Sequence, residues 1–299
     1  HFRNVAYLLR ESALAVQRGE SVADAHRQRI LGLPDRLSAP DALSQMVQAL
    51  DDMTDLPPQD ELLELFEQLR PTALETTLGW LGRVQNIRLR MLLEQSVSRL
   101  AMANTGELVR LIGSGDRNVA IEAMRRAGAL KSPAAVSPLT RVLAEGDVEQ
   151  RQAAVAALSE VGSAGALQAL ERGLADSDRD VRVATARVLA NRGYRAALQR
   201  VETIVKGKAI RDADRSEKMA FFELYGAIAG ESGVSFLDTL LNGKGFLGRR
   251  EDPELRACAA LALGRIGTPK AQDALRTAAS EKDVVVRNAV NRAARGGGG

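Results

Sequence analysis

One signature recurs along this chain at a regular interval, and that interval limits the folds open to it. The signature reads Asp, two variable residues, an aliphatic residue, Arg, six variable residues, Leu, three variable residues and Gly, as in DPELRACAALALGRIG, which begins at Asp252. Complete or partial copies begin at Asp116, Asp147 and Asp178, 31 residues apart, and again at Asp252 and Asp283, also 31 apart. Self-similarity at such a period is typical of solenoids, in which one supersecondary unit is stacked repeatedly.

The interval from Asp178 to Asp252 is 74 residues, which equals two intervals of 37. A copy is therefore expected near position 215, where RSEKMAFFELYGAIAG keeps the closing Gly230 in phase but lacks the Asp and the aliphatic-Arg pair. Upstream, NIRLRMLLEQSV from Asn86 keeps the aliphatic residue and the Arg in their expected relation. The copies predict about seven units, two of them degenerate.

Each unit carries signals for two helices. The Asp is a good N-cap, because its carboxylate accepts hydrogen bonds from free N–H groups of the first turn, and Pro253 follows where proline is tolerated. The closing Gly suits a left-handed C-cap. Ser132-Pro133 and Thr268-Pro269 give the preceding helix a similar start. Apolar residues at three- and four-residue spacing, with only 3% aromatics, favour closely packed helices over a β-sandwich.

The best copy resembles the HEAT repeat family, and in particular the HEAT-like repeats of the phycobilisome (PBS) lyase type. That subclass favours D-x-x-V-R-x-x-A-x-x-A-L-G-x-x-G, which DPELRACAALALGRIG matches nearly throughout. The resemblance covers about Pro71 to Arg295 and implies a right-handed α-solenoid of stacked antiparallel helix pairs. It implies little about activity, because such repeats occur in lyases, glycosylases, hydroxylases and many scaffolds, and are shared by many bacterial proteins.

The segment before the repeats shows no period, although three stretches of it look helical. Residues 1–70 are therefore expected to form irregular helices that cap or extend the array, with a separate small domain as the alternative. Residues 71–295 form the predicted solenoid, and residues 296–299 are a glycine tail expected to be flexible.

The recurring charged residues of the signature are expected to be structural. We predict a ladder of hydrogen bonds between adjacent units, with anion binding by the row of Arg side chains as the alternative. The residues assigned to the ladder are Asp116, Asp147, Arg151, Asp178, Arg182, Asp252, Arg256, Asp283 and Arg287.

Two longer turns interrupt the regular spacing just before the second helix of their units, at residues 205–215 and 242–252. Because matching positions of consecutive repeats lie side by side, the turns are expected to form one basic lip along an edge of the solenoid. An apolar residue in a glycine-rich basic turn indicates contact with a ligand or partner, unless it folds back onto its own helices. The residues predicted to form this contact are Lys206, Lys208, Arg211, Lys244, Phe246, Arg249 and Arg250.

The residues needed for common chemistries are missing. The only histidines, His1 and His26, exclude the His-Glu pairs of HEAT-type hydroxylases and a His-based zinc site. Cys258, the single cysteine, lies in an apolar run and is expected to be a buried core residue, so no nucleophile system is apparent. NGKGFLG lacks the pattern of a phosphate-binding loop, and Trp80 has no partners for a base-stacking platform. We therefore expect no enzyme activity, cofactor or metal.

The predicted function is a scaffold that binds a protein or peptide through the concave inner face of its second helices and through the basic lip. With a net charge of +3 and no apolar run near the ~20 residues of a membrane span, we expect a cytoplasmic protein without membrane contact. The alternative is a nucleic-acid or nucleotide binder that uses the lip; a bilin lyase-like or DNA glycosylase-like enzyme is more remote. Candidate contacts on the second helices are Glu122, Arg125, Arg126, Arg187 and Arg192.

Overall fold

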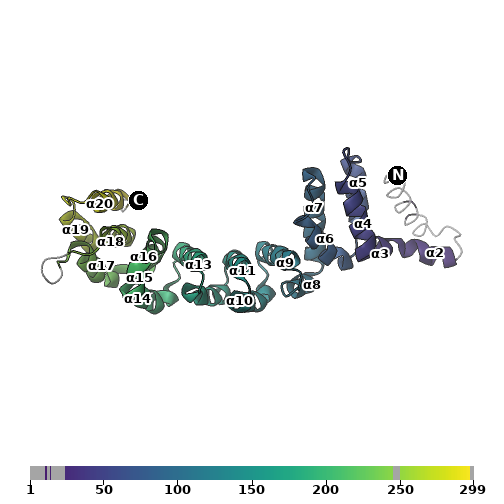
Figure 1. The fold of residues 1–299 in the computed structure, drawn as a ribbon. Coiled ribbons are helices and arrows are strands. Elements are labelled where there is room, and N and C mark those ends of the chain that lie inside the picture. The colour runs from purple at the N-terminus through teal and green to yellow at the C-terminus, as the bar shows by residue number, and fades with distance from the viewer. Residues whose placement is uncertain (1–10, 12–13, 15–23, 245–249, 297–299) are drawn as a thin grey trace. The chain divides into compact units, whose positions relative to one another are not determined.

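The computed structural model describes most of the chain, namely residues 11, 14, 24–244 and 250–296. These residues form α-helices, short 3-10 helices and turns, with no strand among them, so the all-α prediction is confirmed for this part of the chain. The chain divides into two compact units, His1–Val142 and Leu143–Gly299, with the boundary inside α10 (Val136–Glu145) (Figure 1). The boundary expected at residue 70 stays a prediction.

The first unit begins with helices that do not follow the repeat period. Its helices before α10 are α2 (Asp24–Leu31), α3 (Leu33–Leu37), α4 (Pro40–Asp51), α5 (Gln59–Glu67), α6 (Leu74–Leu81), α7 (Ile87–Ala103), α8 (Thr105–Leu111) and α9 (Arg117–Ala129). Helix α4 packs on α6, α5 on α7, and α6 on both α7 and α9. Two of the three helices expected before residue 71 are confirmed as α4 and α5, whereas FRNVAYLLRESALAVQR lies almost wholly outside the described residues.

The second unit is a stack of helix pairs. The first helices of its pairs are α12 (Ala164–Leu170), α14 (Leu198–Lys206), α17 (Val234–Asn242) and α19 (Pro269–Thr277). The second helices are α11 (Val148–Val161), α13 (Arg179–Arg192), α16 (Arg215–Ala229), α18 (Pro253–Ile266) and α20 (Val284–Gly296). Each second helix packs on the next, from α11 to α20, while α17 also packs on α19 (Figure 1). The second helices therefore form one layer of this unit.

Each signature Asp caps its own helix. The cap side chain accepts hydrogen bonds from backbone N–H groups two or three residues later, which satisfies donors that the first helical turn leaves free. The capping residues are Asn86, Asp116, Asp147, Asp178, Asp214, Asp252 and Asp283. For the degenerate unit the sequence predicts a copy that begins at position 215 without its Asp cap. That prediction is wrong, because Asp214 caps α16. The cap is present one residue earlier.

The closing glycines also follow the sequence prediction in most units. Gly162, Gly193 and Gly267 adopt the left-handed conformation, with φ of 60°, 57° and 67°, and end their helices. Gly230 has a φ of 58° but a ψ of −149°, so the degenerate unit ends differently. Because L side chains rarely adopt a positive φ, these positions favour glycine.

Helix α16 shows why the degenerate unit departs from the signature. Phe221, Phe222 and Tyr225 on this helix are each only 1% exposed and replace the small core residues of the other units. The ring of Tyr225 meets that of Phe236 on α17 edge to face, with centroids 5.8 Å apart. Burial, together with the neighbouring carboxylate of Glu202, raises the pKa of Tyr225 to about 12. The core of this unit is therefore aromatic where its neighbours use Ala and Leu.

Candidate partner-binding site

The signature Arg, four residues after the cap, first bonds a carbonyl group of the segment before its own helix. Arg151 donates to the carbonyl of Gly146 in the preceding turn at 2.8 Å, and Arg256 donates to that of Leu241, in the last turn of α17, at 3.0 Å. The same kind of bond to a preceding carbonyl is made by Arg90, Arg182 and Arg287. Turn carbonyls lack the partners that a helix supplies, and the guanidinium group satisfies them with a fixed fork of donors.

In the second unit this residue also reaches the next repeat. Arg151 binds both carboxylate oxygens of Asp176, at 2.9 and 3.0 Å, and neither side chain is more than 15% exposed. Bidentate pairs of this kind combine charge with geometric specificity. The other pairs are Arg182 with Glu217, Lys218 with Glu254, and Arg256 with Glu281.

The acceptors of these pairs are not the signature aspartates. Asp176 and Glu281 stand two residues before the cap of the next helix, whereas Glu217 and Glu254 lie in the first turn of the next helix. The sequence predicts a ladder between the Asp and the Arg of the signature. In the structure the donor is the signature Arg, or Lys218 in the degenerate unit, and the acceptor is a different carboxylate. Asp116 additionally accepts from Arg83 of the preceding pair at 3.2 Å. The Arg row is thus engaged internally, which does not favour the anion-binding alternative.

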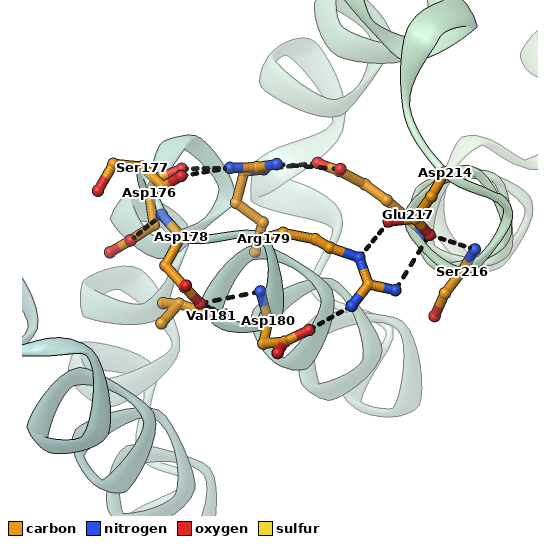
Figure 2. Close-up of polar contacts among 10 residues, drawn as sticks. Asp176, Ser177, Asp178, Arg179, Asp180, Val181, Asp214, Ser216 and Glu217 are labelled. Carbon is orange, nitrogen blue, oxygen red and sulfur yellow. Dashed lines mark hydrogen bonds and ion pairs between the residues drawn. The ribbon is translucent and has the colours of Figure 1, made fainter.

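Figure 2 shows how α13 and α16 are joined beside this ladder. Arg179 on α13 reaches across to the carboxylate of Asp214 and also contacts Asp180 on its own helix (Figure 2). The same Asp214 carboxylate accepts from the backbone N–H of Ser216 at 2.7 Å and of Glu217 at 3.1 Å. The hydrogen bond from Arg179, followed by these backbone bonds, lowers the pKa of Asp214 to about 2.

The two long turns lie side by side, because Arg211 in one donates to Glu251 in the other at 2.8 Å. Arg211 lies on the short helix α15 (Ala209–Asp212), and Arg250 binds Glu281. Lys206 binds Glu202 and lies 5.2 Å from the centroid of the Phe236 ring. Much of the expected positive charge of the lip is therefore balanced within the protein.

The remaining predicted lip residues divide into two groups. Lys208 and Lys244 are exposed and form no ion pair with the described residues. Phe246 and Arg249 lie outside the described residues, so both interpretations of Phe246 stay predictions.

The polar residues predicted as contacts on the second helices are mostly held by neighbouring helices. Glu122 is 8% exposed and pairs with Arg125 at 2.9 Å. Arg187 donates to Ser216 at 3.3 Å, and Arg192 donates to the carbonyl of Ser159 at 2.7 Å. Arg126 lies 3.4 Å from the hydroxyl of Ser98. Their partner-binding role stays a prediction.

The structure reveals a groove that sequence reasoning missed. It runs across the exposed face of α16, α18 and α20, with a volume of about 240 Å³, and continues into an adjoining hollow of about 170 Å³. Among the residues that line it are Arg215, Met219, Cys258, Leu261, Val285 and Arg292. Met219 and Val285 are 37% and 42% exposed, so apolar surface stands open on this face. Met219 stands five residues after its cap and Val285 two residues after its cap, so the repeat spacing alone did not bring them together.

Two other kinds of site are absent from the described residues. No group of three or more His, Cys, Asp or Glu side chains in this part of the chain is placed to hold a metal ion. No helix among the described residues is both long and apolar enough to cross a membrane.

Three solved structures superpose on this chain only loosely. An engineered protein is 17% identical, with coverage of 99% of this chain and 94% of its own and a TM-score of 0.42. Human deoxyhypusine hydroxylase in complex with glycerol is 19% identical, with coverage of 98% of both chains and a TM-score of 0.28. A second engineered protein is 19% identical, with coverage of 81% of this chain and 97% of its own and a TM-score of 0.34. Superpositions this loose carry no argument about activity.

No curated protein matches this chain. The family model described as HEAT repeats matches residues 107–190 and 209–295, which is more than half of the chain. Both matched segments consist of the capped helix pairs described above. The chain therefore belongs to the HEAT repeat family.

Proposed function

We propose that this HEAT repeat protein is a non-enzymatic adaptor that holds a protein or peptide partner on the exposed face of its second helices. The observation that carries the proposal is the groove across α16, α18 and α20, where Met219, Leu261 and Val285 line an open hollow. Contiguous exposed apolar surface bounded by polar residues is typical of interaction sites. Stacked repeats supply such surfaces, because each unit contributes one row of side chains to a broad area.

The arrangement of polar groups supports binding over catalysis. Arg151, Arg182 and Arg256 are engaged in the ladder, and burial raises the pKa of the Cys258 thiol to about 11, which makes it a poor nucleophile. The resemblance to repeats of the PBS lyase type describes the helix pair and assigns no residue to bilin chemistry. The basic lip enters the proposal as a second contact area, through Lys208 and Lys244.

The proposal is tested by affinity capture from cells of the native host with the intact chain as bait. A Met219→Glu variant places a charge in the groove and is expected to lose captured proteins. A Val148→Glu variant is the matched control, because Val148 is an exposed apolar residue (42%) on α11, outside the groove. Equal capture by all three baits would contradict a role for this face.

Captured nucleic acid is distinguished from captured protein by salt. Binding through several phosphate contacts weakens steeply as salt rises, whereas apolar burial does not. Complexes that survive nuclease treatment and about 0.5 M salt support the adaptor proposal. Loss of binding on nuclease treatment alone would instead favour the nucleic-acid alternative.

A further inference from the structure

We propose that the groove binds an acidic peptide segment of a partner protein, with one apolar side chain seated between α16 and α20 and carboxylates paired with Arg215 and Arg292. This inference rests on the proposed function, which it makes specific in site and chemistry. The groove lies wholly within the second compact unit.

The floor of the groove is made of small residues at one repeat position. Cys258 and Ala289 both line the groove, each stands six residues after its helix cap, and they are only 3% and 8% exposed. Small residues at this position leave room above them, because the flanking Met219 and Leu261 are much longer. The resulting hollow of about 240 Å³ is large enough to receive one or two apolar side chains.

The walls supply apolar contact from three helices at once. Met219 comes from α16, Leu261 from α18 and Val285 from α20, and all three line the same hollow. Removal of this surface from water favours an occupant with an apolar side chain. An unaccompanied ion would leave the apolar surface exposed, so a small anion does not fit these observations.

The charged residues around the groove favour an occupant with negative charge. Of its carboxylates, Glu254 is paired with Lys218 at 3.5 Å and Glu223 with Arg265 at 3.6 Å. Arg215 and Arg292 are exposed and make no ion pair or hydrogen bond with the described residues. Two guanidinium groups are thus left to bind carboxylates of a partner, for which their planar forks are well suited.

The positions of the two Arg residues set the length of the segment. They stand two helices apart across the layer, and packed helix axes are separated by about 8–10 Å. Arg215 is the first residue after its cap, whereas Arg292 is the ninth after its own. At the rise of an α-helix, this difference offsets the two Arg residues by roughly 12 Å along the helix axis, in addition to the distance across the layer. An extended chain rises about 3.3 Å per residue, so about six residues connect the two sites. The expected ligand has acidic residues at both ends of such a span and an apolar residue between them.

The same features favour a peptide over a nucleic acid. Among the residues that the structure describes, no aromatic side chain lines the groove, so bases would find no stacking platform there. The two free Arg side chains are separated by apolar surface and not arranged as a continuous row for successive phosphates. An acidic peptide satisfies both the charge and the apolar floor.

The inference is tested by fluorescence polarisation with the full chain. The probe is a labelled ten-residue peptide with a leucine near its centre. Two glutamates precede the leucine and two follow it, and the two glutamate pairs are about six residues apart. Reversal of both charges, in an Arg215→Glu/Arg292→Glu variant, is expected to weaken binding at least tenfold, as loss of two close charge pairs should. Arg172→Glu is the matched control, because Arg172, in the 3-10 helix Glu171–Ala175 outside the groove, is exposed and forms no ion pair with any residue that the structure describes. Its affinity should stay within about twofold of the parent.

Two further peptides separate the contributions of charge and apolar burial. Replacement of the glutamates by glutamine, or of the leucine by serine, should each weaken binding to the parent chain. Circular dichroism and thermal melting establish that the double variant is folded. Equal binding of the glutamine peptide, unchanged binding by a folded double variant, or no binding at about 1 mM peptide would each overturn the inference.

Failure of this inference is distinguishable from failure of the proposed function. If Met219→Glu abolishes capture of native proteins but the double Arg variant does not, the adaptor function stands and the acidic-peptide inference is wrong. If a single-stranded oligonucleotide of equal charge binds the groove more tightly than the peptide, the inference is also wrong. Loss of the same captured proteins with both variants, together with peptide binding, supports both proposals.

Discussion

Gly264 of α18 lies so close to Ala293 of α20 that a Cβ atom on Gly264 would stand 2.7 Å from the Cβ of Ala293. The same relation recurs one pair earlier, where a Cβ on Gly226 of α16 would stand 2.7 Å from the carbonyl oxygen of Ala262. Both glycines are the twelfth residue after their helix cap, and both alanines are the tenth. The second helices are therefore brought together by a repeated contact of Gly with Ala.

A Gly264→Ala variant should be less stable. The added methyl group gains about 1 kcal/mol of helix propensity, but it must displace backbone and Cβ atoms of Ala293, at a cost of about 1–3 kcal/mol. We expect a net loss of about 1–2 kcal/mol in the free energy of unfolding, measured by urea denaturation. Gly106→Ala in α8 is the control, since its Cβ would meet no atom nearer than 3.9 Å. Stabilisation of both variants would contradict the close contact.

Removal of Arg256 should be more damaging than removal of Arg287. Arg256 is 4% exposed and joins the carbonyl of Leu241 to Glu281 of the next pair. Arg256→Leu leaves these groups without their donor and should cost about 3 kcal/mol. Arg287 bonds only carbonyls of its own turn among the described residues, so Arg287→Leu should cost about 1 kcal/mol. Equal losses would show that the link between repeats adds nothing to the turn contacts.

The carboxylate of Glu281 should make stability depend on pH. The hydrogen bond from Arg256 lowers the pKa of Glu281 to about 2, from an ordinary value of 4.5. A carboxyl group with a lower pKa in the folded state contributes stability above its unfolded pKa. That stability is lost as the pH falls from about 5 towards 2. Urea midpoints at pH 7, 4 and 3 should therefore fall less steeply for Glu281→Gln than for the parent chain. Parallel pH profiles would be inconsistent with this pair.

Asp214 combines two roles that substitution can separate. Asp214→Asn keeps an oxygen to cap α16 but removes the negative charge that faces Arg179, so its effect should be small for an exposed pair. Asp214→Ala removes the cap as well and should lower the free energy of unfolding by about 1–2 kcal/mol. If both variants lost the same stability, the ion pair and not the cap would account for the effect of Asp214.

Cys258 reports on the occupancy of the groove. Its thiol is 3% exposed with a pKa raised to about 11 by burial, so a thiol reagent at pH 8 meets a small thiolate fraction. Labelling should be at least about tenfold slower in the native chain than in urea, and the acidic peptide should slow it further. Acceleration by the peptide would show that the ligand opens this face and does not cover it.

The sequence predicts the repeats well because their signals are local. An Asp cap, a Pro at the first helical position and a Gly in the left-handed conformation act within one helix, so spacing alone locates Asp252, Pro253 and Gly267. The same reasoning misplaced the degenerate unit, because it divided 74 residues into equal halves. Measured from the caps, the intervals are 36 residues to Asp214 and 38 to Asp252.

The groove and the ladder acceptors depend on contacts that periodicity does not encode. Arg187 and Arg192 looked free because they stand away from the apolar face, but closely packed helices let long side chains reach the neighbouring turn or helix. Met219 and Val285 are exposed, at 37% and 42%, and nothing in the repeat signature distinguishes them from the apolar residues that are buried. Both outcomes follow from distances between helices, which no single repeat specifies.

The position of the ladder acceptor has a consequence for how this array tolerates insertions. Where the connection is short, the carboxylate that binds the Arg stands in the turn, as in Asp176 and Glu281. Where the connection is long, the carboxylate stands on the helix, as in Glu217, which binds Arg182, and Glu254, which binds Lys218. A carboxylate carried by the helix keeps its place whatever the length of the connection before it. The two lengthened connections are thus positions at which foreign segments can be grafted while the junction between neighbouring repeats stays intact.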